Sequence, residues 1–352
     1  MVRRPRLDPA IFHLPVERMR EGYYSDKYFV RTRELLLKDQ HRPCVTMQVF
    51  GKSHAFLGGI DEAIAILKLC STRWKELEAY ALYDGDEIEP WETVLLIEGP
   101  YDAFAHLETL YLGVLARRTK VGTNTRRVVD AAKPKQVMFF PARHDHWLVQ
   151  TGDGYAAHIA GAIGVSTDAQ ASWWGSEGVG TVPHGLIAAY GGDTVLASRK
   201  FADLTDPSVR LITLVDFDND CVGTALKVAR VLGDRLYGVR IDTSETLVDE
   251  SVVPQMGTFK PTGVNPQLVQ NVRRALDLEG FKQVKIVVSG GFTVEKIRQF
   301  EERAVPVDMY GVGSSLFQGR FDFTADVVRV EGKPVAKVGR SYRPNPRLER
   351  VE

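Results

Sequence analysis

The 352-residue chain has little that would link it to a membrane, to nucleic acid or to an oxidising compartment. Its three cysteines, Cys44, Cys70 and Cys221, form no CxxC pair, which argues against a disulfide framework and a thiolate zinc site. Lysine and arginine (45) balance aspartate and glutamate (45), so no net charge attracts polyanions. No apolar run is long enough to span a bilayer, and no hydrophobic segment follows the basic N-terminal residues. We therefore expect a cytoplasmic protein that binds neither nucleic acid nor membrane.

The C-terminal half alternates short apolar runs with helical patterns. Continuous apolar runs at 211–216 and 236–242 are typical of buried parallel strands, and Gly233 ends the helix between them. A helix that opens at Asn265-Pro266 precedes a strand expected at 284–288, and a helix at 294–303 separates that strand from another at 307–311. Because no hairpin signal interrupts this β–α alternation, it predicts a parallel sheet in an α/β barrel, complete or incomplete.

The first hundred residues have a different pattern. Runs at 43–50 and 91–97 surround a helix near 61–69, which is typical of a mixed α+β domain. Residues 325–337 are predicted to form a β-hairpin that returns to this domain, and the basic tail from Arg340 is expected to be loosely held. The predicted organisation is an N-terminal α+β domain (1–112), a barrel (113–318), and a C-terminal hairpin and tail (319–352) packed on the N-terminal domain.

Side chains that could carry chemistry follow the predicted strands, at the barrel edge where active sites lie. Asp216 ends the first strand, and Arg240 and Asp242 end the second. The small-residue turns 289–291 and 311–314 follow the next two strands, and such turns can wrap a phosphate, although they also mark plain tight turns. Phosphate turns beside carboxylates indicate a Mg²⁺-dependent sugar phosphate or pyrophosphate substrate. Asp218 and Asp220 are equally well explained by helix capping.

One histidine, His184, stands just after the small-residue segment 178–183. Imidazole titrates near neutral pH and is a nucleophile that can accept a phosphoryl group. Taken alone, this histidine is better explained as a structural residue at a helix start. The neighbouring phosphate turns and carboxylates favour phosphoryl chemistry instead.

These motifs follow one another in the order of a known family. Ser-Asp-Lys-Tyr-Phe at 25–29 and the segment 99–115 resemble the family's N-terminal part, and Gly180-Thr181-Val182-Pro183-His184 matches its Gly-Thr-x-x-His. The strand-end residues described above then occur in the family's order. From about Ser25 to about Val338, the chain resembles nicotinate phosphoribosyltransferase, the type II phosphoribosyltransferase family, and most closely its shorter archaeal and bacterial members.

The resemblance implies that nicotinate is joined to 5-phosphoribosyl 1-pyrophosphate (PRPP), which gives nicotinate mononucleotide and pyrophosphate in NAD biosynthesis. It also implies Mg²⁺ as cofactor, and ATP as co-substrate whose hydrolysis is coupled through phosphorylation of His184. Asp216 and Asp242 would hold the metal or the ribose hydroxyls, and Arg240 would lie near the reacting groups. The implied substrate-binding residues are Tyr28, Phe140, Arg143, His144, Thr181, Ser289, Gly290, Gly291, Gly311, Gly313 and Ser314.

Nicotinate is a planar ring with a carboxylate, so its site needs an aromatic face and a guanidinium. Arg143 matches the family's arginine, with a surface salt bridge as the alternative. Tyr28 matches a tyrosine contributed across a dimer interface, which implies a homodimer with shared active sites, although core or interface packing explains this residue better from the sequence alone. His144 stands where the family usually has a second arginine, which leaves the preference for acid or amide open. A metal site at 144–146 is disfavoured because adjacent side chains point in different directions.

Other interpretations stay open. A nicotinamide phosphoribosyltransferase of the same fold stays open because of His144. A quinolinate phosphoribosyltransferase is disfavoured, because two carboxylates need a denser basic cluster than Arg143 supplies and that enzyme uses no phosphohistidine. A non-catalytic PRPP-binding sensor would retain the phosphate turns of an enzyme fold.

Overall fold

The computed structural model describes residues 4–352 and divides the chain into two compact units. The first unit comprises the chain up to residue 124 together with 155–160 and 317–352, and the second comprises 125–154 and 161–316. Residues 113–124 and 155–160, predicted to belong to the barrel, lie in the first unit. Hydrogen bonds hold the first half of helix α4 (Glu108–Ala132) to this unit, because the Thr119 and Thr123 hydroxyls accept the backbone N–H groups of Gly58 and Phe56.

The first unit is built on an antiparallel sheet with the strand order β13-β12-β1-β5-β3-β14. The central strand β1 pairs with β5 on one side and β12 on the other, so Val49 faces Leu95 in one partner and Ala325 in the other. The strands of this unit are β1 (Cys44–Gly51), β2 (Ala55–Phe56), β3 (Glu78–Ala81), β4 (Glu87–Ile88), β5 (Thr93–Pro100), β12 (Phe323–Val330), β13 (Lys333–Pro334) and β14 (Glu349–Arg350). Its helices and short 3₁₀ segments (η) are η1 (Pro9–Phe12), α1 (Val16–Arg20), α2 (Lys27–Lys38), α3 (Ile60–Cys70), η2 (Trp74–Glu76), η3 (Tyr101–Ala103), η4 (Ala105–Leu107) and most of α4.

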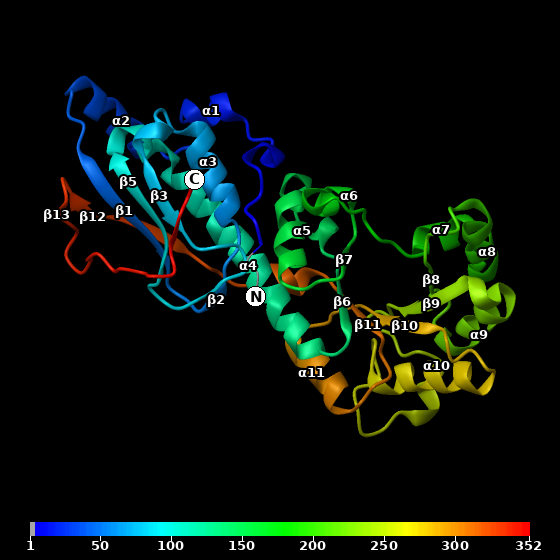
Figure 1. Cartoon of the computed structure of the whole chain (residues 1–352). Coiled ribbons are helices and arrows are strands. Elements are labelled where there is room, and N and C mark those ends of the chain that lie inside the picture. Colours follow the sequence, from blue (N-terminus) through cyan, green and yellow to red (C-terminus); the bar gives the residue numbers. More distant parts are fainter. Residues whose placement is uncertain (1–3) are drawn as a thin grey trace. The chain divides into compact units, whose positions relative to one another are not determined.

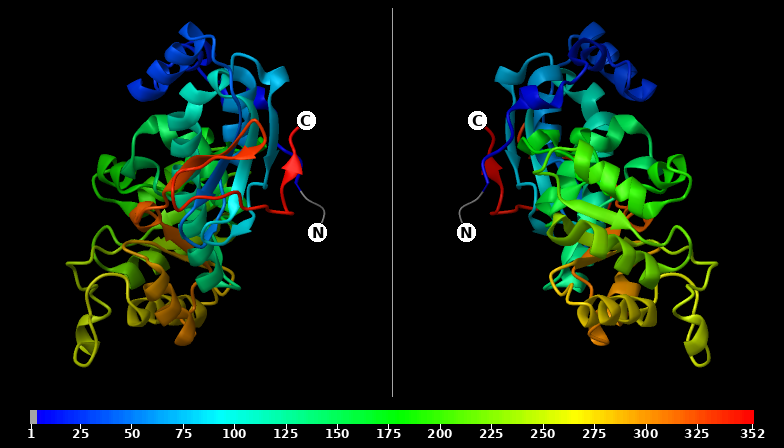
Figure 2. Two further views of the ribbon diagram at one scale, coloured as in Figure 1. Left: turned by 90° about the vertical axis from the view of Figure 1, so that its left-hand side faces the viewer. Right: turned by 90° about the vertical axis from the view of Figure 1, so that its right-hand side faces the viewer.

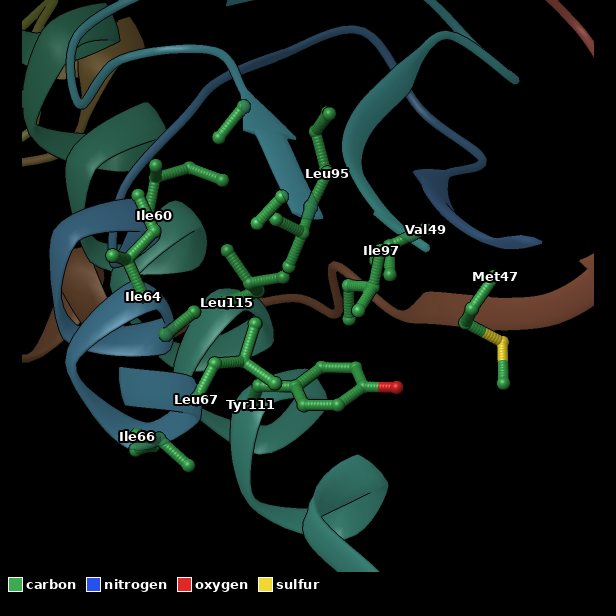
Figure 3. Close-up of a cluster of buried hydrophobic side chains, with 14 of the residues drawn as sticks. Met47, Val49, Ile60, Ile64, Ile66, Leu67, Leu95, Ile97, Tyr111 and Leu115 are labelled. Carbon is green, nitrogen blue, oxygen red and sulfur yellow. The ribbon is translucent and has the colours of Figure 1, made fainter. Parts of the chain in front are cut away.

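The core of the first unit lies between helices α3 and α4 and the antiparallel sheet. Figure 3 shows Ile64 and Leu67 of α3 and Leu115 of α4 directed toward the strand residues Leu95 and Ile97. All five side chains are buried. Burial of this apolar surface, at about 25 cal/mol per Å², is what fixes both helices on the sheet.

The C-terminal tail corrects an expectation from the sequence. The hairpin at 325–337 is present as β12 and β13, but the tail after it is not loosely held. The Arg340 Nε lies 2.6 Å from a carboxylate oxygen of Asp326, and its guanidinium lies 5.2 Å from the centroid of the Trp91 ring. Beyond it, β14 pairs with β3, and Figure 2 shows the red C-terminal segment following the antiparallel sheet. Side-chain contacts to the sheet therefore order a segment whose composition predicts mobility.

The second unit contains a six-stranded, wholly parallel sheet with the order β7-β6-β11-β10-β9-β8. This curled sheet is the incomplete α/β barrel that the β–α alternation predicts. Its strands are β6 (Gln136–Phe139), β7 (Gly164–Val165), β8 (Leu211–Leu214), β9 (Leu236–Ile241), β10 (Lys285–Val288) and β11 (Met309–Val312). Its helical segments are η5 (Ala142–His144), η6 (Trp147–Val149), the start of α5 (Gln150–Ile159), α6 (Asp168–Ala171), η7 (Ser172–Trp174), α7 (His184–Ala189), α8 (Thr194–Leu204), α9 (Cys221–Leu232), η8 (Gly233–Arg235), η9 (Val253–Gln255), α10 (Pro266–Leu278), α11 (Val294–Glu302) and most of η10 (Ser314–Phe317).

An extended segment at 179–182 links the two edge strands of the parallel sheet. The Val179 N–H donates to the Val165 carbonyl of β7 at 2.7 Å, and the Val182 N–H donates to the Ile212 carbonyl of β8 at 2.8 Å. This segment carries Thr181 and leads into His184, the first residue of α7. The Gly-Thr-x-x-His motif therefore lies along the seam of the incomplete barrel.

Side-chain caps fix the starts of the helices that cover the sheet. Asn265 accepts the N–H of Leu268 ahead of Pro266, as the Asn-Pro pair predicts, and Asp220 caps α9 in the same way. Figure 1 shows α9 and α10 beside β8, β9 and β10. Of the helices within residues 4–352, none is both long and apolar enough to cross a bilayer.

Candidate active site

The strand ends of the second unit bring most of the predicted site residues to one edge of the parallel sheet. Parallel strands share this edge, so residues distant in sequence become neighbours there. Asp216 follows β8, Arg240 lies in β9 with Asp242 just after it, and Ser289 follows β10. All of these residues belong to the second unit.

Arg240 links three separate segments through its guanidinium. Its Nε donates to Ser289 Oγ at 2.7 Å, one Nη donates to Thr181 Oγ1 at 3.3 Å, and the other lies 3.2 Å from Asp242 Oδ2. The Ser289 hydroxyl in turn donates to Asp242 Oδ1 at 2.6 Å. We call Thr181, Arg240, Asp242 and Ser289 the Arg240 network.

The Arg240 network is preorganised for binding an anion. The Arg240 side chain is only 19% exposed, and its guanidinium carbon lies 5.3 Å from the centroid of the Phe140 ring. A planar cation held by three partners and stacked on a ring keeps one orientation, and reorienting it on substrate binding costs little.

His184 and Asp216 form a pair beside this network. The His184 Nε2 lies 3.1 Å from both carboxylate oxygens of Asp216. Asp216 is 7% exposed and His184 is 43% exposed, so the carboxylate is buried while the imidazole reaches solvent. Burial raises the pKa of the Asp216 carboxyl; the imidazole opposes that rise, and the Asp242 carboxylate adds to it. Because Nε2 is held by the carboxylate, Nδ1 is the nitrogen left to react.

The two predicted phosphate turns have the backbone geometry that their glycines allow. Gly290 and Gly291 have φ values of +87° and +64°, in the left-handed region that other residues rarely adopt. Among residues 4–352, the N–H groups of these two glycines donate no hydrogen bond. At the other turn, a Cβ on Gly311 would lie 2.6 Å from the Phe140 ring. The Ser315 hydroxyl ties the two turns together by donating to the Phe292 carbonyl at 2.8 Å.

The residues expected to hold the pyridine ring lie on and around η5. Arg143 is exposed, and within the described chain it has no hydrogen bond or ion pair, so the alternative of a surface salt bridge is not seen. The His144 ring packs on the second turn, because a Cβ on Gly313 would lie 3.0 Å from His144 Cε1. His144 therefore lies beside a phosphate turn, and Gly313 provides the space for it. Ser314 is exposed at the start of η10.

Tyr28 lies on α2 in the first unit. Its side chain is 61% exposed, and its ring contacts Phe29 with a centroid distance of 4.2 Å. Core packing therefore does not explain this residue.

No three histidine, cysteine, aspartate or glutamate side chains form a metal-ligating group within residues 4–352. In the His-Asp-His run, His146 Nδ1 accepts the N–H of Leu148 at 3.2 Å, and Asp145 accepts the N–H of His146. The His146 side chain thus caps the start of η6. Asp216 and Asp242 fit Mg²⁺ in its usual mode, in which one or two carboxylates and substrate phosphates share the ion.

Two charged residues near the Gly290–Gly291 turn were not predicted. The Lys296 ammonium donates to the Gly290 carbonyl at 3.1 Å, and burial lowers its pKa. The Glu245 carboxylate lies against Gly291. For Lys296, the one available signal was its place in the first turn of the helix that follows the glycines. Glu245 lies three residues after Asp242, where nothing in the sequence marks it.

Comparison with known sequences relates this chain to phosphoribosyl transfer. The family model described as "Quinolinate phosphoribosyl transferase, N-terminal domain" matches residues 26–119. Nicotinate phosphoribosyltransferase pncB1 of Mycobacterium tuberculosis is 31% identical over 282 residues, which is 77% of this chain and 57% of the relative. Nicotinate phosphoribosyltransferase of Bacillus subtilis is 23% identical over 67% of this chain and 45% of the relative. The chain thus spans about half the length of these curated relatives.

Solved structures extend the relationship to nearly the whole chain. The nicotinate-nucleotide pyrophosphorylase from Pyrococcus furiosus is 33% identical, with a TM-score of 0.81, over 96% of this chain and 85% of that one. Human nicotinic acid phosphoribosyltransferase has a TM-score of 0.64 over 88% of this chain and 75% of that one. At 16% identity, the human structure supports the fold alone.

Proposed function

The chain belongs to the nicotinate phosphoribosyltransferase family of type II phosphoribosyltransferases, and on that premise we propose that it joins nicotinate to PRPP in NAD biosynthesis. The products are nicotinate mononucleotide and pyrophosphate. The observation that carries the proposal is the Arg240 network, which joins a fixed guanidinium to a carboxylate and two hydroxyls, one of them directly before the Gly290–Gly291 turn. This combination suits a substrate with a ribose between two phosphate groups.

In the proposed reaction, the pyridine nitrogen forms a bond to C1 of the ribose as the C1–oxygen bond to pyrophosphate breaks. The electron pair of that bond leaves with the pyrophosphate oxygen, and positive charge develops at C1. The Asp216 and Asp242 carboxylates are suited to accept hydrogen bonds from ribose hydroxyls and to stabilise this charge. Gly290, Gly291, Gly313 and Ser314 hold the 5′-phosphate. Catalysis is then chiefly positioning and electrostatic stabilisation.

Mg²⁺ would be held by Asp216 and Asp242 together with substrate phosphate oxygens. When bound, it neutralises charge on the pyrophosphate. Both carboxylates already accept hydrogen bonds from residues of the site, so they are oriented before any ion arrives.

Recognition of the base is assigned to Arg143, Phe140 and Tyr28. Within the described residues, the exposed Arg143 guanidinium has no hydrogen-bond or ion-pair partner. It is therefore available to pair with the nicotinate carboxylate. Tyr28, whose ring is exposed on α2, is assigned to the site of a second copy of the chain, so the working form is a homodimer with shared sites. We place the enzyme in the cytoplasm.

ATP coupling is assigned to His184. Nδ1 attacks the γ-phosphorus of ATP, the phosphoryl group transfers to this nitrogen, and ADP leaves; water later hydrolyses the phosphohistidine. The Asp216 carboxylate holds Nε2 and stabilises the charged ring. The added negative charge near the pyrophosphate position changes the affinities for substrate and products.

A quinolinate phosphoribosyltransferase is the second candidate, since the Pyrococcus furiosus structure is named nicotinate-nucleotide pyrophosphorylase. One experiment separates the candidates. The purified chain is incubated with Mg²⁺, PRPP and one of nicotinate, nicotinamide or quinolinate, each with and without ATP, and the products are separated by chromatography. Mononucleotide from nicotinate, formed faster with ATP and with ADP release, supports the proposal. Mononucleotide and CO₂ from quinolinate support the second candidate, and bound PRPP that is never consumed supports the sensor.

A further inference from the structure

The Gly290–Gly291 turn is covered by a side chain of the chain itself. A Cβ built on Gly291 would overlap Oε1 of Glu245 and lie 3.0 Å from its carboxyl carbon. The carboxylate therefore lies directly against the α-carbon of Gly291. A negatively charged group thus occupies the surface of a turn whose N–H groups are free within residues 4–352.

Glu245 is free to leave this position. It belongs to the long loop 242–265 between β9 and α10, which Figure 2 shows in yellow, projecting from the helices of the second unit. The residue is exposed, and among residues 4–352 it makes no hydrogen bond and no close ion pair. Packing against the turn and long-range charge therefore hold Glu245 in place, and an anion that binds the turn more strongly can displace it.

Charges of both signs lie around the turn. The Asp242 carboxylate lies beside Gly290, since a Cβ there would be 3.5 Å from its Oδ1, but it is paired with Arg240. The Lys296 ammonium donates to the Gly290 carbonyl and lies 4.4 Å from the centroid of the Phe292 ring. Burial lowers the Lys296 pKa; Glu245 counteracts this shift, and Lys260 adds to it through like charge. With Asp242 paired to Arg240, Glu245 is the carboxylate that faces the two lysines, which is the charge balance of an anion site with an internal counter-ion.

We propose that Glu245 is a displaceable internal anion, which covers the Gly290–Gly291 turn when no substrate is bound and yields its place beside Lys296 to the substrate's 5′-phosphate. This inference rests on the proposed function, because that function assigns the turn to the 5′-phosphate. Competition from Glu245 reduces the fraction of molecules ready to bind and therefore weakens the apparent affinity for phosphate. It also keeps an opposite charge near Lys296 between turnovers and favours release of the phosphorylated product.

The test measures binding of ribose 5-phosphate to the full chain by titration calorimetry. Glu245→Gln keeps the size of the side chain and removes its charge, so we expect binding about 3- to 10-fold tighter than in the wild type. Glu250→Gln, on the same loop and also exposed, is the matched control and should bind like the wild type. Lys296→Met should weaken binding more than about 10-fold, and Lys296→Arg should recover most of it.

Unchanged or weaker binding by Glu245→Gln, or tightening that Glu250→Gln reproduces, overturns the inference. Formation of nicotinate mononucleotide, assayed on the same samples, separates this failure from that of the proposed function. If mononucleotide forms and Glu245→Gln binds no tighter, the inference is wrong and the function stands. If no mononucleotide forms but Glu245→Gln binds more tightly, the function is wrong and the internal anion stands. No binding of ribose 5-phosphate by any variant, together with no mononucleotide, overturns both.

Discussion

Polar side chains join distant segments of the chain in both units, but in the second unit a further group of them gathers at the edge of the parallel sheet. Thr119 and Thr123 fix α4 to the segment 56–58, and Arg340 fixes the tail through Asp326. In the second unit, the side chains of the Arg240 network bond to one another rather than to the backbone, within residues 4–352. The comparison teaches where to look for chemistry, because a polar group that is cross-linked through its side chains alone is where we propose that the reaction takes place.

The largest expected effect comes from breaking the Arg240 network. Arg240→Lys keeps the charge but cannot hold Ser289, Thr181 and Asp242 together, so kcat/KM should fall by about 100- to 1,000-fold. The melting temperature should change little. Arg230→Lys, which alters an exposed pair with Glu279, is the control and should stay within about 2-fold in rate. Retention of more than about a tenth of the activity by Arg240→Lys would remove this network from the chemistry.

The next largest effect distinguishes the binding of nicotinate from the binding of PRPP in the second unit. Arg143→Ala should raise the KM for nicotinate about 10- to 100-fold and the KM for PRPP less than about 3-fold, because the unpaired guanidinium is assigned to the pyridine carboxylate. Steady-state kinetics with each substrate varied in turn measure both constants. Arg303→Ala, at another exposed position of this unit, is the control. Equal increases for both substrates would indicate a structural role instead.

A smaller, more selective effect is expected at His184. His184→Ala should abolish the stimulation by ATP and the release of ADP, while transfer without ATP stays within about 3-fold of the wild type. Asp216→Asn should slow phosphorylation of the ring, since Nε2 loses its charged acceptor. His54→Ala, at an exposed histidine of the first unit, should keep the stimulation. Persistence of ATP stimulation in His184→Ala would contradict the phosphohistidine.

The smallest effect concerns stability in the first unit. Burial, followed by the Asp326 and Asp26 carboxylates, raises the pKa of Glu108 from 4.5 to about 8. The folded state therefore binds a proton more tightly than the unfolded state, and this contribution to stability, present below the lower value, is lost as pH rises toward 8. Glu108→Gln should thus gain about 2–4 °C in melting temperature relative to the wild type between about pH 5 and about pH 8.5. A difference that stays constant with pH, or equals that of the exposed control Glu302→Gln, would show that Glu108 is not coupled to folding.

Local signals explain what could be predicted of the fold. The strands β8 to β11 and the helix α10 follow from apolar runs and caps that involve neighbouring residues, such as Asn265 with Leu268. The order of the tail could not be predicted, because Arg340 stacks on Trp91 and Asn345 bonds to Thr93, both distant in sequence. Short strands such as β7 carry too few residues for a pattern.

The site was predicted in part for the same reason. The ends of parallel strands share an edge, so Asp216, Asp242 and Ser289 could be grouped before their positions were known. The link from Arg240 to Thr181 could not be predicted, because the segment 179–182 joins the sheet through single hydrogen bonds at each edge. In the sequence, Lys296 and Glu245 resemble ordinary solvated charges. Their position beside the backbone of Gly290 and Gly291 becomes apparent only in the structure.

The most direct test of the account is transfer of labelled nicotinate into nicotinate mononucleotide in the presence of PRPP and Mg²⁺, measured side by side for the wild type and Arg240→Lys. The account predicts rapid product formation by the wild type, faster than with nicotinamide or quinolinate, and near-complete loss in the variant, which keeps its fold. Absence of nicotinate mononucleotide with the wild type, or equal rates in the two proteins, would contradict it.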